Sequence, residues 1–280
     1  MMFDDRRITF IGPGVMAEAM VASLTERGGL PGERVMMSGP RPHRLERLHE
    51  KYGAETTTEN RKAVEGASVV VLTVKPQSLA EVLDDLQSSI PQQALVVSIV
   101  AGANLSTIAD HLKHPAVVRA MPNTPGQVGA GITVWTKTSA VSDKQSEHAV
   151  DLLRALGKEI EVEEEDYLNM ATALSGTGPT YVFLFMEAMI DAGVHMGFPR
   201  RIAEELVLET IRGSLKYYEH SASHPARLRN QVTSPGGTSA EAIYYLEKAG
   251  FRTGLARAIW AAYERSVELG EGKRRGRNSS

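Results

Sequence analysis

The sequence contains no cysteine among its 280 residues. This absence excludes a disulfide framework, a thiolate nucleophile, an iron–sulfur cluster and any zinc site with cysteine ligands. An excess of one charge sign is also absent, because 31 Lys and Arg against 34 Asp and Glu leave a formal net charge of −3. Nucleic-acid binding requires a basic surface, so nucleic acid is not an expected partner.

Long apolar runs are absent as well, and all fall well short of the ~20 residues needed to span a bilayer, which argues against a membrane partner. The first ten residues carry acids and lead directly into a strand pattern, so we expect no signal peptide and a cytoplasmic protein. The composition, 42% apolar and 23% charged, is close to the globular average. A prior of roughly 150 residues per domain then predicts two domains.

The first half of the chain alternates short β-branched runs with helical patterns. Two runs, 69–72 and 95–97, are apolar throughout, as in parallel strands covered on both faces. Strands separated by helices form βαβ units, which predict an α/β fold with a doubly wound, mostly parallel sheet. The expected strands are Arg7–Ile11, Arg34–Ser38, Ser68–Val74, Leu95–Ile99, Val117–Met121, Ile132–Trp135 and Glu159–Val162, and the expected helices Met16–Arg27, Arg41–Lys51, Gln77–Gln87, Ser106–Leu112 and Ser142–Leu156.

The pattern changes after about residue 163, where strand signals nearly end and helix-forming residues dominate. The segment 181–190 is apolar on nearly every side, so it must be covered on every side. The remaining helices provide little material for that cover, and we therefore predict burial against a second subunit. The expected domains are 1–163 and an all-α domain over 164–280, with a disordered basic tail from about residue 272.

A glycine-rich turn, GPGVMA at 12–17, directly follows the first expected strand and opens a helix. Gly12 permits the tight turn, and Gly14 lacks a Cβ, so a pyrophosphate can approach the backbone and lie at the helix N-terminus. This GxGxxA pattern is typical of dinucleotide binding when it follows the first strand of an α/β domain. The alternative is an ordinary glycine turn.

The end of the second expected strand indicates which dinucleotide is used. NAD enzymes carry an acid there, which binds the ribose 2′-hydroxyl. This strand ends without an acid, and Ser38 and Arg41 instead offer donors to a 2′-phosphate. The pattern favours NADP(H) over NAD(H), unless Arg41 and Arg44 only begin a solvated helix.

Two further loops follow strands at the edge where open α/β sheets bind ligands, VKP at 74–76 and MPNTP at 121–125. Prolines on both sides of Asn123 fix a loop whose side-chain amide is placed to meet a nicotinamide carboxamide. Each loop, taken alone, is equally compatible with plain turn chemistry.

The helical half contains two glycine-rich breaks, SGTGP at 175–179 and TSPGGTS at 233–239, each before a helix. In the second, hydroxyls and unpaired N–H groups at a helix start form a site suited to a carboxylate. The alternative is a flexible loop with Thr238 or Ser239 as the N-cap.

A catalytic base is missing from the first part of the helical half, because residues 164–215 contain no lysine and only one histidine, His195. A hydroxy-acid dehydrogenase needs such a base to take the alcohol proton. A protonated imine does not, because hydride addition itself neutralises the positive charge. The flanking Gly193 and Gly197 indicate that His195 is a helix-end residue rather than a catalyst.

Six motifs occur in an order and at separations that resemble the pyrroline-5-carboxylate reductase family over residues 6–270. The SGxGP and TSPGG motifs are highly specific to that family. The six segments are GPGVMAEAM at 12–20, VKPQ at 74–77, MPNTP at 121–125, SGTGPTYVF at 175–183, MGFPR at 196–200 and VTSPGGTSAEA at 232–242.

The resemblance implies an N-terminal Rossmann-like domain and a C-terminal all-α dimerisation domain that interlocks with that of a second copy. In this family such homodimers often assemble into decamers. It also implies NADPH-dependent reduction of L-1-pyrroline-5-carboxylate to L-proline, the final step of proline biosynthesis. Some members of the family use NADH, which is therefore a weaker alternative cofactor.

The resemblance further assigns residues to the two ligands. For the dinucleotide, it implies that the pyrophosphate is bound by Gly12, Pro13, Gly14, Val15 and Met16. The adenosine end would lie near Ser38, Arg41 and Asn60. The loop residues Val74, Lys75, Pro76 and Ala101 would line the dinucleotide, and Asn123 would lie near the nicotinamide. For the substrate it implies a carboxylate site formed by Ser234, Gly236, Gly237, Thr238 and Ser239, with the Ser239 hydroxyl as the catalytic contact to the ring nitrogen.

Some positions depart from the family pattern. The usual SPGGTT is SPGGTS here, so Ser239 keeps the hydroxyl but loses the methyl that restricts χ1. Ser223 and Asn230 replace a frequent Glu and a frequent Asp. Two other functions remain open at this point: a related imine or 2-hydroxy-acid reductase with another substrate, and a non-catalytic NADP(H)-sensing regulator.

Overall fold

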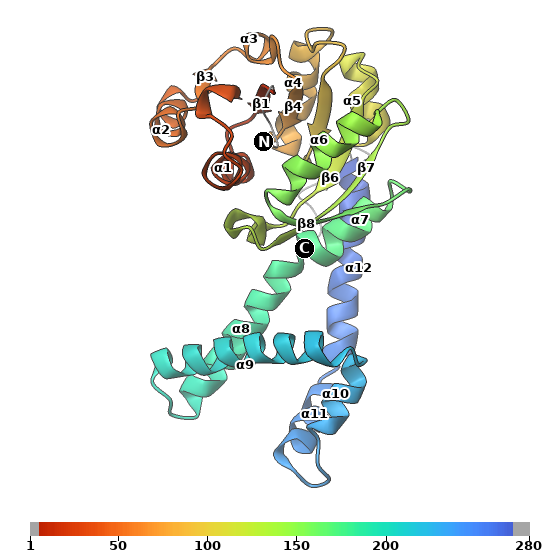
Figure 1. Cartoon of the computed structure of the whole chain (residues 1–280). Coiled ribbons are helices and arrows are strands. Elements are labelled where there is room, and N and C mark those ends of the chain that lie inside the picture. Colours follow the sequence, from red (N-terminus) through yellow and green to blue (C-terminus); the bar gives the residue numbers. More distant parts are fainter. Residues whose placement is uncertain (1–5, 271–280) are drawn as a thin grey trace, which may run out of the picture. The chain divides into compact units, whose positions relative to one another are not determined.

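A computed structural model describes residues 6–270 of the chain. The N-terminal part of the chain forms an eight-stranded sheet with the strand order β3-β2-β1-β4-β5-β6-β7-β8 (Figure 1). Only β6 and β7 pair antiparallel within it. The order reverses between β1 and β4, which creates the topological switch point where such sheets bind ligands. The strands are β1 Ile8–Ile11, β2 Val35–Ser38, β3 Glu55–Thr57, β4 Val69–Leu72, β5 Leu95–Ser98, β6 Val117–Met121, β7 Gly131–Lys137 and β8 Gly157–Glu161.

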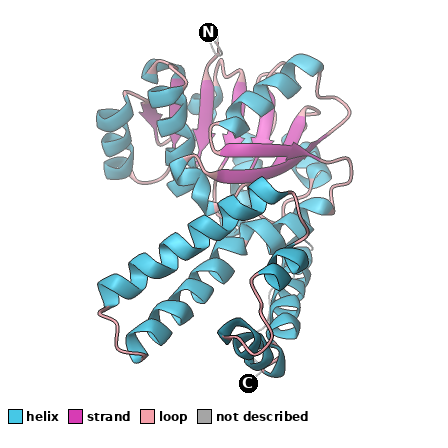
Figure 2. Ribbon diagram, turned by 60° about the horizontal axis from the view of Figure 1, so that its bottom comes forward, coloured by secondary structure: helices cyan, strands magenta, loops and turns pink. Residues whose placement is uncertain are grey.

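Helices cover both faces of this sheet (Figure 2). Alternate residues of the central strands point to opposite faces, so Val71 and Val97 join one buried apolar cluster while Val70 and Val96 join the other. This double burial explains why the central strands are apolar at every position. The covering helices are α1 Val15–Ala22, α2 Pro42–Tyr52, α3 Asn60–Val64, α4 Leu79–Leu86, α5 Leu105–Leu112 and α6 Asp143–Arg154.

The predicted fold class is confirmed, and each expected strand is present with small changes at its ends. Two elements were not expected from the sequence, β3 and α3, which follow one another between α2 and β4. β3 is a three-residue edge strand of Glu, Thr and Thr, exposed or half-buried along its length. A strand this short and polar has no hydrophobic alternation by which to identify it.

The chain divides into two compact units. The first comprises the chain up to Thr177 together with the residues from Ala262 onward, and the second is Gly178–Ala261. Helix α7, Tyr167–Ala171, therefore belongs to the first unit, and α12, Phe251–Gly270, contributes residues to both. The boundary expected near residue 163 stays a prediction, and the expected tail lies outside the described residues.

The second unit consists of helices and buries little apolar surface of its own. Within the part of the chain that is described, Ala203 and Val207 are its only buried hydrophobic side chains. By contrast, Phe183, Leu184 and Trp260 are 63%, 65% and 63% exposed, respectively. So large an apolar surface indicates a contact with another protein surface. Besides α12, its helices are α8 Gly178–His195, α9 Arg200–Ser221, α10 Pro225–Gln231 and α11 Thr238–Lys248.

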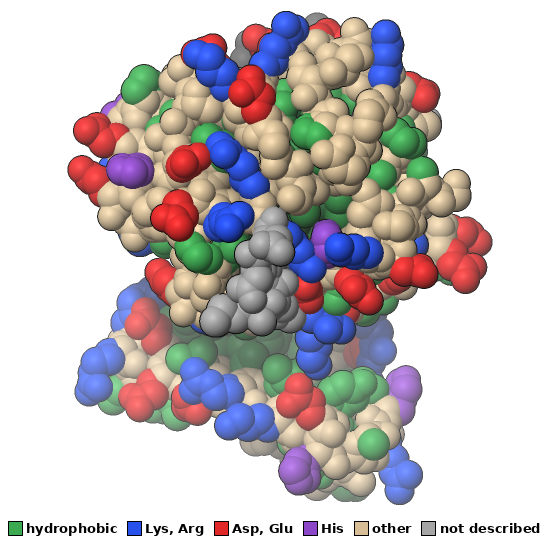
Figure 3. Space-filling model, turned by 45° about the horizontal axis from the view of Figure 1, so that its top comes forward, with side chains coloured by type: hydrophobic (Ala, Val, Ile, Leu, Met, Phe, Trp, Pro, Cys, Tyr) green, Lys and Arg blue, Asp and Glu red, His purple; other side chains and the backbone are tan. Residues whose placement is uncertain are grey.

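The surface of the chain carries both charge signs. Figure 3 shows Lys and Arg side chains interspersed with Asp and Glu over the viewed face. No helix within residues 6–270 combines the length and apolar character needed to cross a lipid bilayer. The expectation that neither nucleic acid nor a membrane is a partner stays a prediction.

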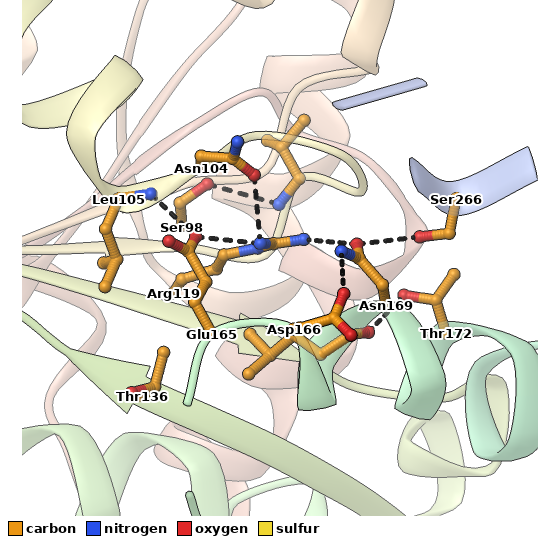
Figure 4. A network of polar contacts seen from close by, with 12 residues as sticks. Ser98, Asn104, Leu105, Arg119, Thr136, Glu165, Asp166, Asn169, Thr172 and Ser266 are labelled. Atoms are coloured by element: carbon orange, nitrogen blue, oxygen red, sulfur yellow. Dashed lines mark hydrogen bonds and ion pairs between the residues drawn. The ribbon is translucent and has the colours of Figure 1, made fainter. Parts of the chain in front are cut away.

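A buried polar network joins β6 to three helices of the first unit (Figure 4). The Arg119 guanidinium, 3% exposed, donates to Glu165 Oε1 at 2.8 Å, to Asn169 Oδ1 at 3.1 Å and to Asn104 Oδ1 at 3.3 Å. Ser266 of α12 also donates to Asn169 Oδ1, at 3.1 Å. A buried cation requires such partners, so the network holds the end of α12, from Ala262 onward, and the segment around α7 against the sheet.

We predict that Arg119→Met lowers the free energy of unfolding by about 2 kcal/mol, because it removes the cation from Glu165 and one donor from each of two amide oxygens. Glu165 keeps the Leu105 N–H and Asn169 keeps the Ser266 hydroxyl. The predicted loss of unfolding free energy lies below the usual cost of breaking a fully buried ion pair, since the Glu165 side chain is 31% exposed. Urea-induced unfolding of both proteins measures the difference. The control is Arg154→Met, which removes an exposed partner of Glu159 and should cost less than about 0.5 kcal/mol; equal losses would contradict the prediction.

Candidate functional site

The loops after β1, β2 and β4 leave the sheet at the same edge. Ile11, the last residue of β1, is in register with both Ser38 of β2 and Leu72 of β4. The Gly12 N–H donates to the Ser38 carbonyl at 2.9 Å, which fixes the start of the glycine-rich turn against β2. The structure therefore brings the turn, the end of β2 and the loop at Val74 together at the switch point of the sheet.

Gly12 occupies a position where no other residue fits. Its φ is +103°, and a Cβ built there would lie 2.8 Å from both the Val74 backbone nitrogen and Val74 Cγ1. The turn is stabilised further by Thr73, whose hydroxyl donates to the carbonyls of Gly12 at 2.6 Å and Ile11 at 3.0 Å. Thr73 has no signal in the sequence that marks this role, because its partners are distant in the chain.

Gly14 occupies an open position. A Cβ there would meet only the Thr73 carbonyl, at 3.8 Å. Gly14 is also the N-cap of α1, and no side chain caps this helix. The first N–H groups of α1 are therefore available to an anion, with no Cβ above them, as a bound pyrophosphate requires.

A cluster around Glu18 of α1 connects the turn to α2. Arg44 donates from Nε to the Pro13 carbonyl at 3.3 Å and forms an ion pair with Glu18. Lys51 and Tyr52 each donate to Glu18 Oε1 at 3.2 Å. Burial alone would raise the pKa of Glu18, but the hydrogen bonds and the charge of Arg44 outweigh it and lower that pKa below its ordinary value. Arg44 is thus not a free helix-start cation.

The end of β2 contains the residues expected near the adenosine ribose. Ser38 is fully buried, and its hydroxyl donates to Asn60 Oδ1 at 2.7 Å. Arg41 is exposed, and within residues 6–270 its guanidinium has no ion pair. Ser38 and Asn60 thus lie together, while Arg41 is the cation left open to solvent; their contacts to a cofactor stay predictions.

The remaining cofactor candidates follow neighbouring strands. Lys75 and Pro76 are exposed after β4, and Ala101 is half-buried after β5. Asn123, after β6, accepts the Ile132 N–H at its Oδ1, 2.9 Å away. That contact fixes the amide and leaves its NH2 group for another acceptor.

The loop at 233–239 in the second unit forms a defined turn. The Gly237 N–H donates to the Ser234 carbonyl at 3.1 Å, and Gly236 has a φ of +71°. With Pro235 before it, this is a type II turn, which requires a positive φ at its third residue. Because the Gly237 N–H is occupied, it is not available to a ligand.

Helix α11 begins directly after this turn, with Gly237 as the N-cap and no side-chain cap. The alternative in which Thr238 or Ser239 caps the helix is therefore wrong. Within the described residues, no acceptor is found for the N–H groups of Thr238 and Ser239. These two amides and the nearby hydroxyls leave an anion site at the start of an 11-residue helix.

Both parts of the chain match known protein families. The family described as "Pyrroline-5-carboxylate reductase dimerisation" matches residues 165–269. The family described as "NADP oxidoreductase coenzyme F420-dependent" matches residues 7–102. The two matches together cover the glycine-rich turn and the turn at 234–237.

Individual proteins match over almost their whole length. The pyrroline-5-carboxylate reductase of Synechocystis sp. is 39% identical over 265 residues, 95% of this chain and 98% of that protein. A solved structure of the enzyme from Coxiella burnetii is 37% identical with a TM-score of 0.85, covering 94% of this chain and 98% of that one. The Plasmodium falciparum pyrroline carboxylate reductase, solved with NADP bound, is 29% identical with a TM-score of 0.88, covering 96% and 99%.

We predict different results for alanine at the two glycines of the turn. Gly12→Ala should lower both the stability of the fold and the affinity for NADP⁺, because its Cβ would overlap the backbone at Val74. Gly14→Ala should leave the melting temperature nearly unchanged and weaken NADP⁺ binding at least tenfold, because its Cβ would occupy the position expected for the pyrophosphate. Thermal melts and calorimetric titration measure the two effects; unchanged NADP⁺ affinity in Gly14→Ala would contradict the assignment.

Proposed function

Since this chain belongs to the pyrroline-5-carboxylate reductase family, we infer that it reduces L-1-pyrroline-5-carboxylate to L-proline with NADPH, the final step of proline biosynthesis. The observation that carries this conclusion is the match to full-length relatives, at 39% identity over 95% of the chain for the Synechocystis enzyme. The protein is therefore an oxidoreductase that acts on a CH–NH group and uses a nicotinamide dinucleotide.

We propose that the dinucleotide lies along the carboxyl edge of the sheet. The open backbone at Gly14 and the uncapped start of α1 fit a pyrophosphate, and the exposed Arg41 fits a 2′-phosphate. Asn123, fixed through Ile132, would donate from its NH2 group to the nicotinamide carboxamide. When bound, NADPH supplies the hydride that is transferred to C5 of the imine.

We propose that the substrate carboxylate binds at the start of α11. The N–H groups of Thr238 and Ser239 and the hydroxyl of Ser234 would donate to it, and the Ser239 hydroxyl would hydrogen-bond the ring nitrogen. Gly236 and Gly237 shape the turn, and Gly237 takes no direct part through its N–H, which Ser234 occupies. The reaction needs no further base, because hydride addition neutralises the protonated imine, and positioning of the reactants supplies much of the acceleration.

A dimerisation-domain match over 165–269 supports oligomer formation. We propose a homodimer formed through the helical unit, because its large apolar side chains are exposed in the single chain. The arrangement of dimers as a decamer and the cytoplasmic location are predictions that follow from the family resemblance and the sequence.

We predict a defined substrate pattern in an NADPH-oxidation assay. Pyrroline-5-carboxylate should be turned over much faster than its six-membered homologue. 2-Keto acids should not be reduced, because their reduction needs a proton donor, and residues 164–215 contain no lysine and only one histidine, His195. NADPH should be preferred to NADH in kcat/KM. Faster reduction of a keto acid would favour a hydroxy-acid reductase, and NADPH binding without any turnover would favour a regulator.

We predict that Ser239→Ala lowers kcat about tenfold or more, the effect of losing one hydrogen bond to a charged group. The dissociation constant of NADPH should stay unchanged, because the hydroxyl contacts the substrate only. Ser239→Thr serves as the matched variant: it keeps the hydroxyl and restores the methyl, so kcat should stay at or above that of the parent. Full turnover in Ser239→Ala would remove this residue from the mechanism.

A further inference from the structure

The carboxylate of Asp85, on α4, is connected by hydrogen bonds to the end of β2, although the two are far apart in the sequence. Asp85 Oδ2 accepts a hydrogen bond from Asn60 Nδ2 at 3.1 Å, and Asn60 Oδ1 accepts the Ser38 hydroxyl at 2.7 Å. Asp85 Oδ1 also lies 3.2 Å from Arg61 Nε. These contacts form a chain of hydrogen bonds from a half-exposed acid to a fully buried serine.

The carboxylate determines the direction of every hydrogen bond in this chain. An ionised carboxylate only accepts hydrogen bonds, so Asn60 must direct its NH2 group toward Asp85. The amide oxygen of Asn60 then faces Ser38, which must donate its single hydroxyl hydrogen. Without the carboxylate, either orientation of the amide would satisfy Ser38, because a hydroxyl can donate or accept.

The groups left for a ligand at this end of the sheet are therefore donors. The hydrogen of Ser38 is committed to Asn60, and Ser38 itself is fully buried. Asn60 is half-buried and keeps a second N–H, for which the described chain contains no acceptor. Arg41 adds an exposed guanidinium, whereas Arg44 is occupied by Glu18 and Pro13. A set of donors fits a phosphate better than a ribose hydroxyl, which needs an acceptor.

We propose that Asp85 is a positioning residue for cofactor choice: it holds the amide of Asn60 with its N–H side available to a ribose 2′-phosphate, and so favours NADP(H) over NAD(H). The proposal rests on the proposed function, because it places the adenosine end of the dinucleotide at Ser38 and Asn60. Asp85 acts through Asn60 and does not itself contact the cofactor.

Simple electrostatics predicts the opposite effect for this residue. A carboxylate close to a phosphate repels it, so removal of the Asp85 charge should strengthen binding of a 2′-phosphate. Replacing this acceptor-only carboxylate by a group that no longer requires a donor should weaken the same binding, because the Asn60 amide can then turn its oxygen toward the phosphate. The sign of the change therefore distinguishes the two explanations.

The test uses Asp85→Asn in the full-length chain, titrated calorimetrically with adenosine 2′,5′-bisphosphate and with 5′-AMP. We expect the preference for the bisphosphate, given by the ratio of the two dissociation constants, to fall about threefold or more. The ratio of kcat/KM for NADPH to that for NADH should fall in parallel. Asp84→Asn is the matched control, because it removes the same charge from the neighbouring, exposed position of α4 and should leave or slightly raise the preference.

A preference that is unchanged or increased in Asp85→Asn, relative to Asp84→Asn, would overturn the proposal. If Asp85→Asn does not fold, Asp85→Ala, which removes the acceptor of the Asn60 amide altogether, should shift the preference in the same direction. The nucleotide titrations do not depend on turnover. A parent protein that binds both nucleotides but does not reduce pyrroline-5-carboxylate would therefore contradict the proposed function while still deciding the role of Asp85.

Discussion

The close approach of the turn after β1 to the backbone at Val74 is the constraint on which the rest of the site depends. Only glycine fits at position 12, because a Cβ would lie 2.8 Å from Val74. The same turn is bound to β2 through Ser38, to the end of β4 through Thr73 and to α2 through Arg44. Three elements thus hold the start of α1 at the switch point of the sheet, where its free N–H groups can meet a phosphate.

The chemistry of the reaction explains why the candidate site residues are glycine turns and hydroxyls rather than a set of acids and bases. Both ligands are anions, and each unit offers the uncapped N-terminus of a helix directly after a glycine, at Gly14 and at Gly237. Hydride transfer to a protonated imine neutralises charge, so orientation of the two reactants is the main requirement. The apolar surface of the second unit fits the same account, because a dimerisation domain is completed by its partner.

Sequence patterns predicted the features that depend on local periodicity and local turn chemistry. The buried strands, the turn at Gly12 and the turn before Thr238 all have such signals, since apolar runs and paired glycines are visible within a few residues. The edge strand β3 has none. The same holds for the contacts of Arg119, Arg44 and Asp85, whose partners lie far away in the chain. For Ser38 the sequence correctly indicated a hydroxyl at the end of β2, but only the fold shows that its hydrogen is donated to Asn60.

The most direct test of the central claim follows the hydride itself. NADPH carrying deuterium at both hydrogen positions of the nicotinamide C4 is incubated with the protein and pyrroline-5-carboxylate, and the product is analysed by NMR and mass spectrometry. Direct transfer predicts L-proline with one deuterium, located at C5. Proline without deuterium, deuterium at another carbon, or no proline at all would contradict the account.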